Sequence, residues 1–129
     1  KRMGYDKQKL GKWGEDQGCS YFIANGYQIL QRNYRCRFGE IDIIAQKTGQ
    51  LIFAEVKTRT STVYGYPAEA VSYRKQLRYE KLALNFLKET GWKNASCRFD
   101  ILEVMVQPNN TFTINHIDNA FQAGSGRYY

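Results

Sequence analysis

The sequence predicts a single α/β domain with a mixed β-sheet flanked by helices, in the order α-β-β-β-α-β-β. Three observations carry this prediction. The 129 residues are 43% hydrophobic, which is enough apolar material for one core. Two long segments have helical spacing of their apolar residues, and five shorter apolar segments separated by turn signals have the character of strands.

Apolar residues recur at intervals of three and four in two segments, which predicts amphipathic helices. The first segment is Lys7–Asn25, and Gly26 directly after it is a favoured terminator. The second follows Ser72, a favoured N-cap residue, and runs to about Thr90, before Gly91. The domain therefore begins with one helix and carries a second in its C-terminal half.

The remaining apolar segments are short, and several alternate polar with apolar residues, which predicts strands. The predicted strands are Tyr27–Arg35, Gly39–Gln46, Leu51–Lys57, Cys97–Val106 and Thr111–Ile117. A polar loop is expected at Thr58–Pro67. The domain is expected to cover residues 1–123, with a mobile tail at residues 124–129.

The charge balance narrows the class of partner. Lys and Arg total 19 against 12 Asp and Glu, a net charge of +7, which favours a polyanion such as nucleic acid. A basic protein with no such ligand remains the alternative. No apolar run reaches the ~20 residues that span a bilayer, so no membrane association is expected. The three cysteines form no close pair and His116 is the one histidine, which argues against a zinc site and favours a cytoplasmic location.

Four charged residues are predicted to share one side of a β-hairpin. Side chains alternate along a strand, so Glu40 and Asp42 lie on one face, as do Glu55 and Lys57. The isoleucines, alanines and valine between them, Ile41, Ile43, Ala45, Ile52, Ala54 and Val56, are predicted to face the core. A two-residue turn at Thr48-Gly49 places Asp42 opposite Glu55, and Glu40 opposite Lys57.

Two facing carboxylates repel each other, and a divalent cation such as Mg²⁺, or Mn²⁺ in its place, removes the conflict. Lys57, two residues beyond Glu55, is placed to approach a metal-bound phosphate. This combination suits metal-assisted phosphodiester hydrolysis. The alternative is an ordinary solvated hairpin face with surface ion pairs. The apolar context of both strands favours the metal site, because a charge there is costly without a partner.

The segments Gly39–Ala45 (GEIDIIA) and Phe53–Arg59 (FAEVKTR) resemble the signature of the YraN family of small bacterial proteins. The resemblance extends over residues 11–105 and includes Gly14-Glu15-Asp16 and Arg98-Phe99-Asp100. It implies a restriction-endonuclease-like PD-(D/E)xK fold, similar to that of archaeal Holliday-junction resolvases. It also implies that Asp42, Glu55 and Lys57 are the three motif residues, with Glu15 as a further acid at the metal. Ile41 stands where that superfamily commonly has proline.

Basic residues are expected on the same side as the acids, where they would hold a polyanion. The candidates for contact with nucleic acid are Arg32, Arg35, Arg59, Lys75, Gln76 and Arg78, and ordinary surface charge is their alternative. Three other polar residues receive structural interpretations. Glu40 is expected to form an ion pair with Lys57, Asp100 to bind Arg98 or a backbone amide, and His116 to be a surface or structural histidine.

The sequence thus favours a Mg²⁺-dependent endonuclease that acts on DNA in preference to RNA, with structured or branched DNA as one candidate substrate. A non-catalytic nucleic-acid-binding protein that keeps the nuclease fold is the alternative, and a structural or adaptor protein is a third reading. Since resolvases cut two strands as symmetric dimers, the resemblance also allows a homodimer.

Overall fold

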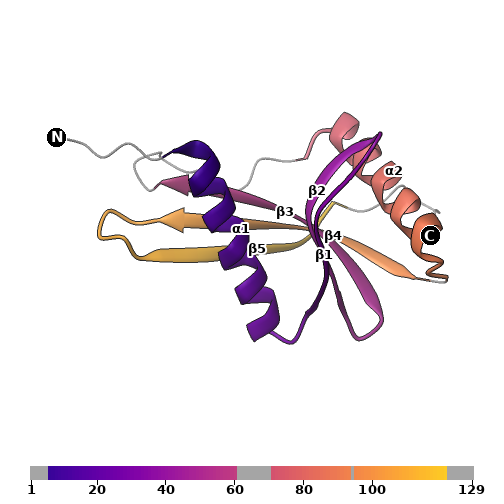
Figure 1. Cartoon of the computed structure of the whole chain (residues 1–129), viewed down its shortest axis with the longest axis horizontal. Helices are drawn as coiled ribbons and strands as arrows, with labels where there is room; N and C mark the ends of the chain where they lie inside the picture. Colours follow the sequence, from indigo (N-terminus) through magenta and orange to yellow (C-terminus); the bar gives the residue numbers. More distant parts are fainter. Residues whose placement is uncertain (1–5, 61–70, 94, 122–129) are drawn as a thin grey trace.

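The computed structural model describes residues 6–60, 71–93 and 95–121. Within these ranges the predicted order α-β-β-β-α-β-β is confirmed (Figure 1). The elements are α1 (Lys7–Ala24), β1 (Gln28–Cys36), β2 (Gly39–Lys47), β3 (Gln50–Thr60), α2 (Tyr73–Thr90), β4 (Ser96–Val106) and β5 (Phe112–Phe121). The strands form one sheet in the spatial order β1-β2-β3-β4-β5. Only β3 and β4 pair in parallel, so the sheet is mixed, as predicted.

Helix α1 covers one face of the sheet. It begins at Asp6, whose carboxylate accepts hydrogen bonds from the N–H groups of Gln8 and Lys9, at 2.9 and 3.3 Å. Its buried side carries Cys19 and Phe22. These pack against a layer of small and branched side chains of the sheet: Ile43, Ala45, Ile52, Ala54 and Leu102.

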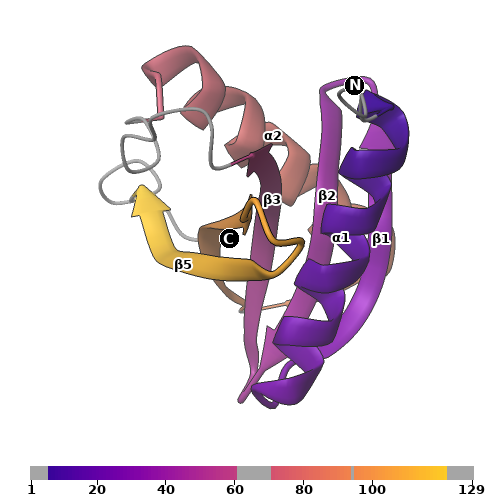
Figure 2. The same ribbon diagram turned by 90° about the vertical axis from the view of Figure 1, so that its left-hand side faces the viewer.

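Helix α2 covers the opposite face, so the sheet passes between the two helices (Figures 1 and 2). The Ser72 side chain caps its start by accepting the Lys75 N–H at 3.2 Å, and Gly91, with a φ of 76°, ends it. Leu82, Ala83 and Phe86 meet the aromatic and aliphatic residues Ile44, Leu51, Phe53 and Phe99. The alternation in the sequence predicts one buried face for the hairpin of β2 and β3, whereas both faces of these strands are buried.

The hairpin of β1 and β2 changes face halfway along its length. Arg32 and its partner Ile43 lie on the α1 side, whereas Tyr34 and its partner Ile41 belong to the core under α2. Asn33, between them on β1, has a left-handed φ of 52°. The prediction that Ile41 shares a face with Ile43 is therefore wrong, and the left-handed backbone at Asn33 marks the position where the hairpin changes face.

Two strands are longer than predicted. β3 continues to Thr60 instead of ending at Lys57, because it pairs with β4 along its whole length. β5 reaches Phe121, beyond a break in its pairing with β4 between Phe99 and Ile101. Residues 61–67 of the predicted loop and the predicted tail at residues 124–129 lie outside the described residues. No helix in the described ranges is long and apolar enough to cross a membrane.

Candidate active site

The candidate site forms where the ladder between β2 and β3 ends. The predicted register is confirmed from Lys47↔Gln50, across the Thr48-Gly49 turn, to Ile43↔Ala54. At the next position Asp42 leaves the ladder, and its Oδ2 accepts a hydrogen bond from the Val56 N–H at 2.8 Å. A carboxylate thus takes the place of a backbone carbonyl, and it lies between two pockets, one on each side of β2.

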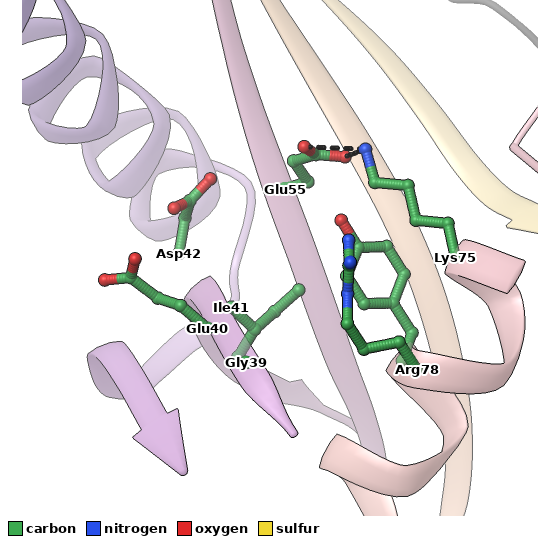
Figure 3. A pocket seen from close by; sticks show the side chains of 8 residues that line it. Gly39, Glu40, Ile41, Asp42, Glu55, Lys75 and Arg78 are labelled. Atoms are coloured by element: carbon green, nitrogen blue, oxygen red, sulfur yellow. Dashed lines mark hydrogen bonds and ion pairs between the residues drawn. The ribbon is translucent and has the colours of Figure 1, made fainter. Parts of the chain in front are cut away.

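The first pocket, here the Glu55 pocket, faces α2 and has a volume of about 330 Å³ (Figure 3). It is lined by Gly39, Glu40, Ile41, Asp42, Glu55, Lys75, Arg78 and Tyr79. Lys75 Nζ lies 3.0 Å from both carboxylate oxygens of Glu55, and it hydrogen-bonds Oε2. Glu55 Oε1 is buried and accepts no hydrogen bond. The pocket therefore contains two predicted metal ligands, Asp42 and Glu55, and a cation already bound to one of them.

The second pocket, here the Glu15 pocket, faces α1 and has a volume of about 460 Å³. It is lined by Lys7, Leu10, Gly11, Glu15, Asp42, Val56, Thr58, Arg59 and Thr60. Gly14 allows the close approach of α1, because a Cβ atom there would collide with the Thr58 side chain. That approach brings Glu15, the next residue, to the same pocket as Asp42.

Asp42 sits in an electrostatic environment that disfavours its charge. Burial, joined by the carboxylates of Glu15, Glu55 and Glu40, raises the pKa of Asp42 to about 6, although the Val56 N–H acts in the opposite direction. The three predicted acids of the site thus influence one another across the two pockets. A bound cation would offset the electrostatic repulsion among these carboxylates, and such clusters of perturbed acids are common at functional sites.

Lys57 lies on the same side of β3 as Glu55 but lines neither pocket. It has no hydrogen bond or ion pair with any residue that the structure describes. In the parallel ladder it aligns with Glu103 of β4, a carboxylate that is only 4% exposed. Glu103 Oε1 accepts a hydrogen bond from Asn115 at 2.9 Å, and Oε2 is buried without a hydrogen bond.

Sequence reasoning missed Glu103 and Tyr79. Glu103 interrupts the apolar run Ile101–Met105, which is the same signal that identified Asp42, so it could have been found. Tyr79, whose pKa is raised by burial and by the charge of Glu55, lies one helical turn after Lys75. Nothing in its sequence context separates it from the other tyrosines.

The predicted basic residues divide into two groups. Lys75 and Arg78 line the Glu55 pocket and Arg59 lines the Glu15 pocket, so these three lie beside the acids. The other three candidates line neither pocket, although two of them bind acids of the site. Arg32 donates to Asp16 at 2.7 Å and lies 3.9 Å from Glu15 Oε1, and Arg35 donates at 3.1 Å to Glu40, which lines the Glu55 pocket. The uncharged Gln76 donates to the Val71 carbonyl at 2.8 Å.

The expected ion pair between Glu40 and Lys57 is wrong, because Arg35 is the partner of Glu40. The pairing of β1 with β2 continues to Arg35↔Glu40, whereas the ladder of β2 with β3 ends at Ile43↔Ala54. Glu40 is therefore held across β1. Lys57, on β3, forms no ion pair with Glu40.

The carboxylates of the two pockets are the possible ligands for a divalent cation. No group of three His, Cys, Asp or Glu side chains within residues 6–60, 71–93 and 95–121 is arranged closely enough to bind a metal ion. The ligand types of Asp42 and Glu55 nevertheless suit a divalent cation such as Mg²⁺. Asp42 and Glu55 offer only oxygens as ligands, and the Lys75 ammonium already lies 3.0 Å from both oxygens of Glu55, so this position favours a positive charge. Mg²⁺ typically takes one or two carboxylates and completes its shell with water and phosphate oxygens.

A second buried acid, on the α1 face, has a structural role. Asp100 accepts two hydrogen bonds from Arg98 at 2.8 Å, interacts with His116 Nε2 at 2.6 Å, and accepts the Asn119 N–H at 3.0 Å. His116 also hydrogen-bonds the Tyr21 hydroxyl at 3.0 Å. The structural interpretations of Asp100 and His116 are confirmed.

Comparison with known proteins places these residues in a family. The profile of "Uncharacterised protein family UPF0102" matches residues 14–104, a range that contains Asp42, Glu55 and Lys57. A UPF0102 protein of Caldicellulosiruptor saccharolyticus is 42% identical over 90% of this chain and 99% of its own length. A UPF0102 protein of Symbiobacterium thermophilum is 44% identical over 90% of this chain and 98% of its own.

Proposed function

We propose, on the premise that this chain belongs to the uncharacterised protein family UPF0102, that it is a Mg²⁺-dependent endonuclease acting on DNA. The family is the one that the sequence resembles under the name YraN. The observation that carries the proposal is the position of Asp42. Its carboxylate lines one pocket with Glu55 and another with Glu15, and basic side chains line both.

Asp42 and Glu55 would hold the cation from two adjacent strands, and Glu15 of α1, which shares the other pocket with Asp42, would be a further acid near it. A cation bound there supplies polarisation of a phosphate oxygen and a lowered pKa for its water. Lys57 cannot be a ligand while it is protonated, so its role would be to orient the attacking water or to offset charge on the phosphate. Mn²⁺ is expected to replace Mg²⁺, since both accept oxygen donors.

Lys75, Arg78 and Arg59 would hold the phosphates on either side of Asp42, because they line the two pockets. The net charge of +7 favours association with a polyanion, in a salt-dependent manner. We propose DNA in preference to RNA as the substrate, with structured or branched DNA as a candidate form, and the cytoplasm as the place of cleavage. Cleavage of two strands at a branch would require a symmetric homodimer.

A non-catalytic nucleic-acid-binding protein is the second candidate. It is favoured by the contact between Lys75 and Glu55, which neutralises one proposed ligand within the protein itself. In that case the basic residues of the two pockets would bind phosphates, and the acids would have no cation to hold.

A cleavage panel tests the proposal. Labelled single-stranded, duplex and four-way-junction DNA, with matched RNAs, are incubated with the full chain and Mg²⁺ or Mn²⁺. The comparison is between wild type, Asp42→Asn, and Asp118→Asn, an exposed acid of β5 outside both pockets. We expect metal-dependent cleavage that Asp42→Asn loses and Asp118→Asn keeps. Salt-dependent binding without cleavage would select the second candidate, and cleavage by Asp42→Asn at the wild-type rate would rule out the proposed site.

A further inference from the structure

Lys75 holds one of the proposed metal ligands. Its ammonium lies 3.0 Å from each oxygen of Glu55, and the two side chains are 27% and 23% exposed (Figure 3). The lysine comes from the first turn of α2, where its backbone N–H is bound by the Ser72 cap. Its backbone is thus fixed, while its four-carbon side chain reaches across to β3.

The ion pair between Lys75 and Glu55 compensates a local excess of negative charge. Glu55 shares its pocket with Asp42 and Glu40, and a half-buried carboxylate in such a place is costly without a counter-ion. An ammonium can fill this need in the absence of metal. It would compete with a divalent cation there, because it lies 3.0 Å from both Glu55 oxygens and the two positive charges repel each other.

If the Lys75 ammonium left Glu55, a phosphate at the mouth of the Glu55 pocket could become its new partner. Arg78, one turn further along α2, lines the same pocket, so a phosphate at its mouth would meet two cations from one helix. Lysine suits such an exchange, since its ammonium is a compact charge on a flexible chain.

We infer that Lys75 is an exchangeable counter-ion that neutralises Glu55 in the metal-free protein and transfers to a phosphate of the nucleic acid when a divalent cation binds Glu55. The inference rests on the proposed function of the Asp42–Glu55 site. It predicts that metal and nucleic acid each strengthen the binding of the other, because each favours the released position of Lys75. Lys75 then makes cation binding by the free protein weaker than its carboxylates alone would allow.

The test is calorimetric titration of the full chain with Mg²⁺, and in parallel with Mn²⁺, in the absence of nucleic acid. It compares wild type, Lys75→Met and Lys81→Met, an exposed lysine of the same helix outside both pockets. We expect Lys75→Met to bind the cation about tenfold more tightly. Lys81→Met, which removes the same charge, should bind like wild type. Lys75→Gln, which keeps a donor for Glu55 without the charge, serves the same comparison if Lys75→Met does not fold.

A second measurement follows the transfer itself. In a Lys57→Ala background, which suppresses cleavage, Mg²⁺ should raise the affinity for a labelled DNA duplex several-fold when Lys75 is present. The increase should be smaller in the Lys75→Met variant. Cation affinity that is unchanged or weaker in both Lys75 variants overturns the inference and leaves the proposed function standing. Absence of cation binding in every variant, Lys75→Met included, rejects the proposed metal site and the inference with it.

Discussion

Asp42, which is half-buried, and Asp100, which is buried, lie in apolar strands of the same sheet, and they differ in what surrounds them. Asp100 has Arg98, His116 and the Asn119 N–H within hydrogen-bond distance, and although burial opposes them, these partners lower its pKa below the usual value. Asp42 has one backbone N–H, and burial with three nearby carboxylates raises its pKa to about 6. The difference shows that an acid in an apolar strand does not identify a site, whereas its partners do.

The largest effect on stability is expected from removing Asp100, the aspartate that has several hydrogen-bond partners. Asp100→Ala leaves the Arg98 guanidinium and His116 without their buried partner, which typically costs about 3–5 kcal/mol of unfolding free energy. Urea unfolding of Asp100→Ala and of the exposed control Asp118→Ala measures the loss. A loss below about 1 kcal/mol would mean that the Asp100 network is not what stabilises the α1 face.

The unfolding free energies of wild type and Asp100→Ala, measured as the pH is lowered, test the same prediction further. The folded-state pKa of Asp100 lies below its ordinary value of 3.8, so its stabilisation is present above that pH and is lost as the pH falls through the folded-state pKa. The deficit of Asp100→Ala relative to wild type should therefore be constant near neutrality and shrink only below about pH 4.

Lys57→Ala is expected to give the opposite result, a loss of activity without a loss of stability. Lys57 has no ion pair or hydrogen bond within the described residues, so its removal should leave the unfolding transition in place. Under the proposed function, cleavage should fall on the order of 10²–10³-fold, the usual cost of losing one transition-state contact. Single-turnover cleavage rates, with Mg²⁺ affinity measured beside them, check this. Cleavage at the wild-type rate by a folded Lys57→Ala would remove Lys57 from the mechanism.

Asp42→Asn should stabilise the metal-free protein. The amide oxygen can still accept the Val56 N–H, and the repulsion from the neighbouring carboxylates is gone. Because the pKa of Asp42 rises from 3.8 to about 6 on folding, its charge should cost the wild type roughly 1–2 kcal/mol at neutral pH, after allowance for partial exposure. Urea unfolding in EDTA measures the gain.

The stability gain of Asp42→Asn over wild type is expected to depend on pH. A raised folded-state pKa favours the folded protein below pH 3.8, and that advantage is lost as the pH rises through about 6. The gain of Asp42→Asn over wild type should therefore be absent near pH 4 and complete by about pH 7. A variant that is less stable than wild type at pH 7 would contradict the electrostatic account of Asp42.

Much of the fold could be predicted because its signals are local. The helix start at Ser72, the stop at Gly91 and the hairpin turn at Thr48-Gly49 each depend on a few adjacent residues. The turn also set the register that places Asp42 next to Glu55. The partner of Asp100 was predictable for the same reason, since Arg98 lies two positions away on one strand face.

The rest depends on how elements pack. The polar/apolar alternation of β2 shows no interruption between Ile41 and Ile43, so the sequence could not show that these two residues belong to opposite faces. The irregular backbone lies on the neighbouring strand, at Asn33 of β1. The contact between Lys75 and Glu55 joins α2 to β3 and has no local signature. These two features decide that Asp42 lines both pockets and that Glu55 already has a cation beside it.

The most direct test of the central claim is thermal unfolding of the full chain across a series of Mg²⁺ and Mn²⁺ concentrations. A cation that binds only the folded protein stabilises it by about 1.4 kcal/mol for each tenfold excess over the dissociation constant. We predict that the melting temperature of wild type and of Asp118→Asn rises with either cation, and that of Asp42→Asn does not. No rise for wild type at millimolar cation, or an equal rise for Asp42→Asn, would contradict the assignment of Asp42 and Glu55 as a cation site.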